Sequence, residues 1–111
     1  MEVQAHRFRS LKYRVAPTFR FFRSNGEYVL TITPDADTTL PELVLVVKDG
    51  GIPLNPKNGN VVLRIPAGSM CAPRQPLTVT FRGDSLPERW RARLFVAQDD
   101  DCNWLDLIEE T

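Results

Sequence analysis

The sequence lacks several residues and patterns on which whole protein classes depend. It has one histidine, two cysteines and a formal net charge of zero in 111 residues. A balanced charge argues against a general nucleic-acid binder, because such proteins neutralise phosphates with an excess of basic residues. Two cysteines are too few for a disulfide framework. No apolar stretch reaches the roughly 20 residues that cross a bilayer, so we expect no membrane insertion.

The usual motifs of catalysis and cofactor binding are also missing. The sequence contains neither a P-loop nor a GxGxxG motif. His6 has Glu2 as its only local carboxylate, so no catalytic triad can be assembled around it. His6 and two distant cysteines are a poor zinc ligand set. We therefore predict a protein that is not an enzyme and holds no cofactor or metal; a glycosidase-like carboxylate pair, which leaves no sequence pattern, stays open.

The two ends of the chain differ in charge. Six basic residues lie within residues 1–33, and residues 97–111 carry six acidic residues and no basic one. The two ends compensate each other, or they form opposed faces that contact a partner. Residues 1–7 lack the basic-then-apolar pattern of a secretory signal, which favours the cytoplasm unless the chain is a mature or excised fragment.

What the sequence does contain is a series of short apolar runs with period two, separated by glycine and proline. The pair Asn25-Gly26 is the one that a type I′ hairpin turn requires. We expect loops over 34–41 and 66–76, and a final strand or one helical turn within 103–111. Strands are expected over residues 3–15, 19–23, 28–33, 43–47, 52–54, 60–65, 77–82 and 90–96.

This spacing predicts one all-β domain over residues 1–111, an antiparallel sandwich of about seven or eight strands. Glycine and proline leave no room for crossover helices, so the sheets should be antiparallel. The architecture is similar to immunoglobulin-like and fibronectin-III-like sandwiches. The cysteine spacing of true immunoglobulin domains is absent, because Cys71 and Cys102 flank the expected strands.

One strand is apolar on both faces. It comprises Leu43, Val44, Leu45, Val46 and Val47, between Glu42 and Lys48. A sandwich strand normally buries one face and wets the other, so the chain's own ends or another chain must cover the second face. We predict a protein partner or self-association through the sheet that contains this strand. Alternation also predicts that Arg91 and Arg93 give a later strand an ordinary wet face, and that Val61, Leu63 and Ile65 share one side.

Residues Arg82, Gly83 and Asp84, followed by Ser85, resemble the integrin-recognition tetrapeptide. We expect them on the last long hairpin loop of the sandwich. This resemblance implies an extracellular adhesion domain. The alternative is that Gly83-Asp84 is ordinary turn chemistry.

Three further groups have a functional and a structural interpretation. The aromatic residues Tyr13, Tyr28, Trp90 and Trp104 are either a platform for sugar rings or core residues. The acidic run at 99–103 is either a loose calcium site, assisted by Asp35 or Asp37, or a solvated turn. Cys71 and Cys102 lie at the same end of the domain if 77–82 and 90–96 form a hairpin, where they form a bridge or stay reduced.

These observations predict a non-enzymatic protein-interaction or assembly module. The alternatives are a carbohydrate-binding module, with a glycan ligand, and the adhesion domain. The candidate interaction residues are the strand at 43–47 and Arg82, Gly83 and Asp84.

Overall fold

The computed structural model describes residues 17–83, 86–98 and 104–109, and within these ranges it contains strands and no helix. No helix that could span a membrane occurs among these residues. The nine strands are β1 (Thr18–Ser24), β2 (Glu27–Thr33), β3 (Thr38–Thr39), β4 (Leu43–Asp49), β5 (Asn60–Ile65), β6 (Met70–Cys71), β7 (Leu77–Arg82), β8 (Trp90–Val96) and β9 (Trp104–Leu107).

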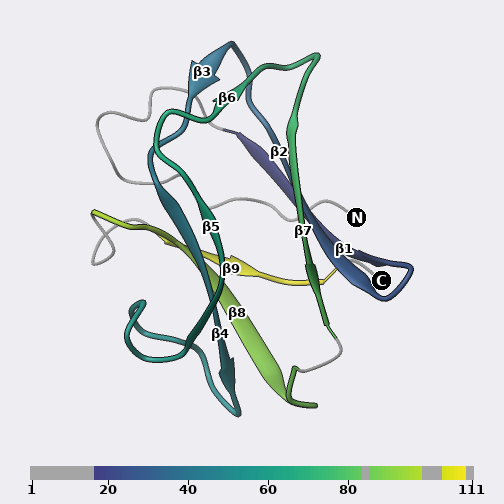
Figure 1. Cartoon of the computed structure of the whole chain (residues 1–111), viewed down its shortest axis with the longest axis vertical. Coiled ribbons are helices and arrows are strands. Elements are labelled where there is room, and N and C mark those ends of the chain that lie inside the picture. The colour runs from purple at the N-terminus through teal and green to yellow at the C-terminus, as the bar shows by residue number, and fades with distance from the viewer. Residues whose placement is uncertain (1–16, 84–85, 99–103, 110–111) are drawn as a thin grey trace.

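The strands form three antiparallel sheets (Figure 1). A three-stranded sheet has the order β1-β2-β7, and a four-stranded sheet has the order β5-β4-β8-β9. The short strands β3 and β6 pair with each other. The all-β, antiparallel character predicted from the sequence is therefore confirmed.

The β1–β2 hairpin forms where the sequence predicts it. Asn25 and Gly26 have φ angles of 52° and 79°, the positive values that a type I′ turn needs. The turn sets the register Ser24↔Glu27, which continues along the strands to Thr18↔Thr33. Because side chains alternate with period two, this register places Phe21 opposite Leu30 on the buried face.

The two larger sheets pack against each other through one hydrophobic core. Aromatic rings join the two sheets: Trp90 of β8 contacts two rings of the three-stranded sheet edge-on. The ring centroids are 5.0 Å apart for Tyr28 and 6.1 Å apart for Phe21. The fully buried centre contains Phe19, Phe21, Leu30 and Ile32 from the three-stranded sheet and Leu43, Leu45, Leu94 and Leu105 from the four-stranded sheet.

A bulge interrupts the pairing of β4 with β5. Leu45 pairs with Leu63 and Val46 pairs with Val61, so Val62 is the extra residue. Val62 and Leu63 both pack against the inter-sheet core, whereas Val61 lies opposite Val46, whose side chain belongs to a separate cluster. The prediction that Val61, Leu63 and Ile65 share one side is therefore wrong, since the extra residue turns Val61 to the other face.

Four further expectations have definite outcomes. Residues 52–54 form no strand, and the expected loops 34–41 and 66–76 contain β3 and β6, which pair. The strand alternative at the C-terminal end is confirmed by β9. The segments 77–82 and 90–96 are strands but not a hairpin, because β7 and β8 belong to different sheets. The predicted strand at 3–15 lies outside the described residues.

Replacement of Gly26 tests the hairpin turn. A Cβ there would meet nothing within 4 Å, so the cost of Gly26→Ala is the strain of its positive φ alone. We expect a loss of about 1 kcal/mol in the free energy of unfolding, measured by urea denaturation. The control is Gly51→Ala, where the nearest atom to a Cβ is Lys48 Cε at 3.9 Å and φ is not positive. Equal losses for both variants would contradict the turn assignment.

Candidate interaction surface

The central strand β4 is buried on both faces within a single chain. Leu43, Leu45 and Val47 belong to the inter-sheet core. Val44 and Val46 are 2% and 0% exposed and form a second cluster with Phe95 on the outer face of the four-stranded sheet. The two-faced apolar character expected of residues 43–47 is therefore real, but their side chains do not reach the surface of the chain.

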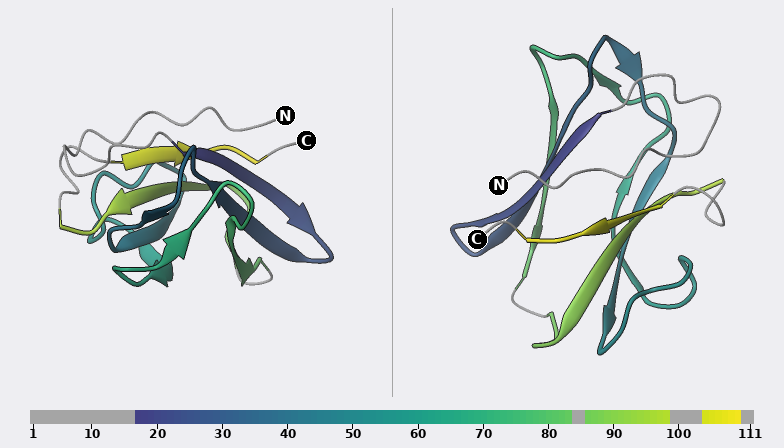
Figure 2. Two further views of the ribbon diagram at one scale, coloured as in Figure 1. Left: turned by 90° about the horizontal axis from the view of Figure 1, so that it is seen from above. Right: turned by 180° about the vertical axis from the view of Figure 1, so that it is seen from behind.

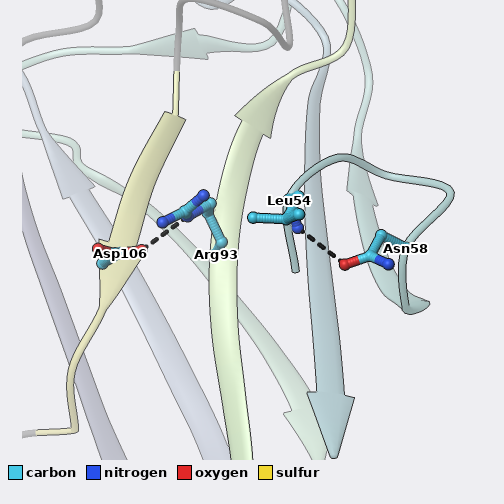
Figure 3. Close-up of polar contacts among 4 residues, drawn as sticks. All are labelled: Leu54, Asn58, Arg93 and Asp106. Carbon is cyan, nitrogen blue, oxygen red and sulfur yellow. Dashed lines mark hydrogen bonds and ion pairs between the residues drawn. The ribbon is translucent and has the colours of Figure 1, made fainter. Parts of the chain in front are cut away.

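The outer face of the four-stranded sheet holds a buried arginine. Arg93 is 8% exposed, and its Nε donates to Asp106 Oδ1 at 2.7 Å (Figure 3). Its Cζ lies 3.9 Å from the centroid of the Trp104 ring. The salt bridge and the ring offset the cost of removing the guanidinium from water. The prediction that Arg93 lies on a wet face is wrong, because β9 lies beside β8 and brings both partners to it.

The β4–β5 loop holds a hydrophobic side chain in solvent. Asn58 Oδ1 accepts from the backbone N–H of Leu54 at 3.0 Å (Figure 3). It also accepts from Lys48 Nζ at 3.1 Å. These bonds tie the loop to β4, because Lys48 belongs to that strand. Leu54 nevertheless stays 70% exposed. The loop therefore presents an apolar side chain from a fixed backbone.

Strand β5 follows that loop and forms one edge of the four-stranded sheet (Figure 1). Its pairing partner among the described strands is β4. Val61 on its outer face is 36% exposed, and Asn60 and Arg64 are also exposed. The strand contains neither proline nor lysine, but its bulge and the charged Arg64 are both features that protect sheet edges. We call β5 together with Leu54 the β5 edge.

The Arg82-Gly83 motif has a structural explanation. Arg82 is exposed at the end of β7, where it pairs with Glu27 of β2. A Cβ at Gly83 would lie 2.5 Å from Cε2 of the buried Tyr28, so the packing of this ring requires glycine. Gly83 O also accepts from Leu86 N–H at 3.1 Å. Asp84 and Ser85 lie outside the described residues, and the loop joins two sheets rather than closing a hairpin.

The aromatic side chains do not gather into one platform. Tyr28 is 5% exposed and stacks with Phe21 and Phe81 in the core, and Trp90 closes that stack from the other sheet. Trp104 packs instead with the cluster on the outer face. Tyr13 lies outside the described residues. Trp90 and Trp104 are therefore on opposite faces of the same sheet.

The remaining candidates from the sequence are the two cysteines and the acidic run at 99–103, and they give little support for a site. Cys71 is a free, buried thiol whose pKa is raised by desolvation, and Cys102 and residues 99–103 lie outside the described residues. Cys71 lines a depression of about 350 Å³ with Asp37 and Gln75. In the part of the chain that the structure describes, no group of three or more acidic, histidine or cysteine side chains could hold a metal ion.

The sequence alone does not indicate the β5 edge as a separate surface. The available clue was the run Val61-Val62-Leu63, in which three adjacent apolar residues break the alternation of a strand. Such a run is compatible with a bulge, which places two neighbours on one face. Which strand lies at an edge is decided by pairing between distant segments, and no local pattern reports it.

A cycle of two substitutions tests the structural role of Gly83. Because the new Cβ would overlap Tyr28, Gly83→Ala should lower the free energy of unfolding by about 1–3 kcal/mol. In a Tyr28→Leu background, which removes the ring, the same substitution should cost less than about 0.5 kcal/mol. Urea denaturation of the four proteins gives the coupling. Additive losses would show that the Tyr28 ring is not what excludes a side chain at residue 83.

Two ion pairs with different burial provide a second comparison. Asp106→Asn leaves the guanidinium of Arg93 buried without its carboxylate, so we expect a loss of about 1–3 kcal/mol in the free energy of unfolding. The control is Glu42→Gln, whose partner Arg64 is 3.7 Å away with its side chain 61% exposed; its loss should stay below about 0.5 kcal/mol. The reverse order in a thermal or urea melt would contradict the burial argument.

Comparison of the chain with protein-family models, with curated proteins and with solved structures finds no match in any of the three.

Proposed function

We propose that the chain is a fibronectin-III-like β-sandwich that serves as a non-enzymatic protein-interaction or assembly module. The strand order supports the fold assignment. With the short β3–β6 pair set aside, the first, second and fifth strands make one sheet, and the third, fourth, sixth and seventh make the other. Two antiparallel sheets packed on a shared core are the architecture expected for such a sandwich.

The working surface that we propose is the β5 edge, and one observation carries the proposal. Val61 is 36% exposed on β5, a strand whose outer edge is unpaired among the described strands, and Leu54 in the preceding loop is 70% exposed. Unpaired backbone groups give a partner strand its hydrogen bonds, and apolar side chains give it surface to bury. The sequence predicts contact with a partner through the sheet that contains residues 43–47. The surface that we propose belongs to the same sheet but lies on β5 rather than on β4.

The edge strand β7 of the other sheet provides the contrast. It also lacks proline and lysine, but its outward side chains are Thr78, Thr80 and Arg82, all of them exposed and polar. Polar outward side chains are what a sheet face in water normally carries. The β5 edge differs by its apolar surface, which favours it as the contact.

A charged residue on each edge tests the proposal. Lysine on an edge strand opposes strand addition, so Val61→Lys should weaken the capture of binding proteins by the immobilised chain by about tenfold or more. The matched control is Thr80→Lys, which places the same charge on β7 and should leave capture unchanged. Far-UV circular dichroism of both variants verifies that the sheets persist. Equal capture by wild type and Val61→Lys would refute the β5 edge as the working surface.

A further inference from the structure

We propose that Asn25, at the tip of the β1–β2 hairpin, is a site of spontaneous covalent modification, where the side-chain amide is lost as ammonia. The chain contains two Asn-Gly pairs, Asn25-Gly26 and Asn58-Gly59. A glycine after asparagine favours this reaction, because it has no side chain to obstruct the approach of its backbone nitrogen to the amide carbon. The two dipeptides are the same, so their folded surroundings decide which one reacts. This inference does not depend on the proposed function.

The reaction needs water as its only co-reactant. The backbone nitrogen of Gly26 forms a bond to Cγ of Asn25, the Cγ–Nδ2 bond breaks, and the amide group leaves as ammonia with the proton that the backbone nitrogen gives up. Water then opens the succinimide ring, adding a hydroxyl to one ring carbonyl and returning a proton to the nitrogen. Opening at Cγ gives aspartate, and opening at the main-chain carbonyl carbon gives isoaspartate. The attack is intramolecular, so its rate depends on how freely the two groups meet.

The hairpin tip leaves the reacting groups of Asn25 and Gly26 unrestrained. Both residues are exposed and lie between the last pair of β1 and β2, Ser24↔Glu27. Within residues 17–83, 86–98 and 104–109, neither the Asn25 side chain nor the Gly26 N–H takes part in a hydrogen bond. Exposed loop tips of this kind open locally at low cost. The Asn25 amide is therefore free to turn toward the Gly26 nitrogen.

The second pair is held in place by hydrogen bonds. Asn58 is half-buried, and its Oδ1 accepts from the backbone N–H of Leu54 at 3.0 Å and from Lys48 Nζ at 3.1 Å. Figure 3 shows the Asn58 amide directed across the loop to Leu54. These bonds fix the orientation of the amide, so a rotation that brings its carbon to the Gly59 nitrogen breaks them. Because one of the two donors is charged, Asn58 should react about tenfold or more slowly than Asn25.

Conversion of Asn25 changes both the charge and the backbone of the hairpin. Asn25, Glu27 and Arg82 line one depression of about 270 Å³, so the new carboxylate joins a carboxylate and a guanidinium there. Isoaspartate also routes the main chain through the former side-chain carbon and lengthens it. The register Ser24↔Glu27 requires a two-residue turn, so the isoaspartate form should lose this pairing at the hairpin end.

Incubation of the chain in warm, mildly alkaline buffer tests the assignment. Peptide mapping by mass spectrometry should show replacement of the amide by a carboxyl group at Asn25, at a rate about tenfold or more above that at Asn58. In urea, which unfolds the chain and removes the hydrogen bonds, the two rates should converge. Far-UV circular dichroism verifies that the chain stays folded in the buffer without urea.

A pair of lysine variants tests the restraint on the second site. Lys48→Met removes one of the two hydrogen bonds to Asn58 Oδ1, so it should raise the rate at Asn58 and leave the rate at Asn25 unchanged. The matched control is Lys57→Met, because Lys57 bonds to Asn55 Oδ1 through its backbone N–H alone and should affect neither rate.

Equal rates at the two sites in the folded chain, or faster conversion at Asn58, overturn the inference. It also fails if Asn25 keeps its amide in the folded chain while the unfolded chain loses it. None of these outcomes changes the capture of binding proteins by the β5 edge, so this inference and the proposed function fail separately.

Discussion

The structure depends on the burial of β4 from both sides. Its odd-numbered residues, Leu43 among them, complete the core between the two larger sheets, and Val44 and Val46 pack with Phe95 on the far face. β4 therefore takes a central place in its sheet, between β5 and β8 (Figure 2). Burying an aliphatic side chain contributes about 1.5–3 kcal/mol, so a strand buried on both faces anchors its neighbours. The positions of β5, β8 and β9 follow from this anchor.

The outer cluster also explains the polar contacts on that face. Arg93 lies beside Val46 in the pairing of β8 with β4, so its guanidinium is surrounded by apolar side chains and needs local partners. Asp106 and Trp104 supply them from β9. The arginine stacks by its planar face and donates from its edge, a combination that a lysine ammonium cannot reproduce. Both faces of β8 are therefore largely buried, although charged and apolar residues alternate in its sequence.

Packing against the aromatic stack explains the glycine of the Arg82-Gly83 motif. Phe21, Tyr28 and Phe81 stack within the three-stranded sheet, and Trp90 meets them edge-on. Gly83 follows this sheet where Tyr28 leaves no space for a Cβ. The glycine in the Arg82-Gly83 sequence is thereby accounted for by packing. Four large hydrophobic side chains among the described residues stay exposed: Leu54, Val61, Met70 and Ile108. Val61 lies on the edge strand β5 that we assign to assembly, and Leu54 lies in the loop before it.

The sequence by itself determined the all-β character, the Asn25-Gly26 hairpin and the limits of β5, β7 and β8, because alternation and turn chemistry act over a few neighbouring residues. It also revealed that residues 43–47 are apolar on both faces. Only the tertiary structure decided which strands pair, that β7 and β8 belong to different sheets, that Arg93 is buried, and that Val61 turns outward at the bulge. These features arise from contacts between segments far apart in the chain, where the partner, rather than the local pattern, selects the face that is buried.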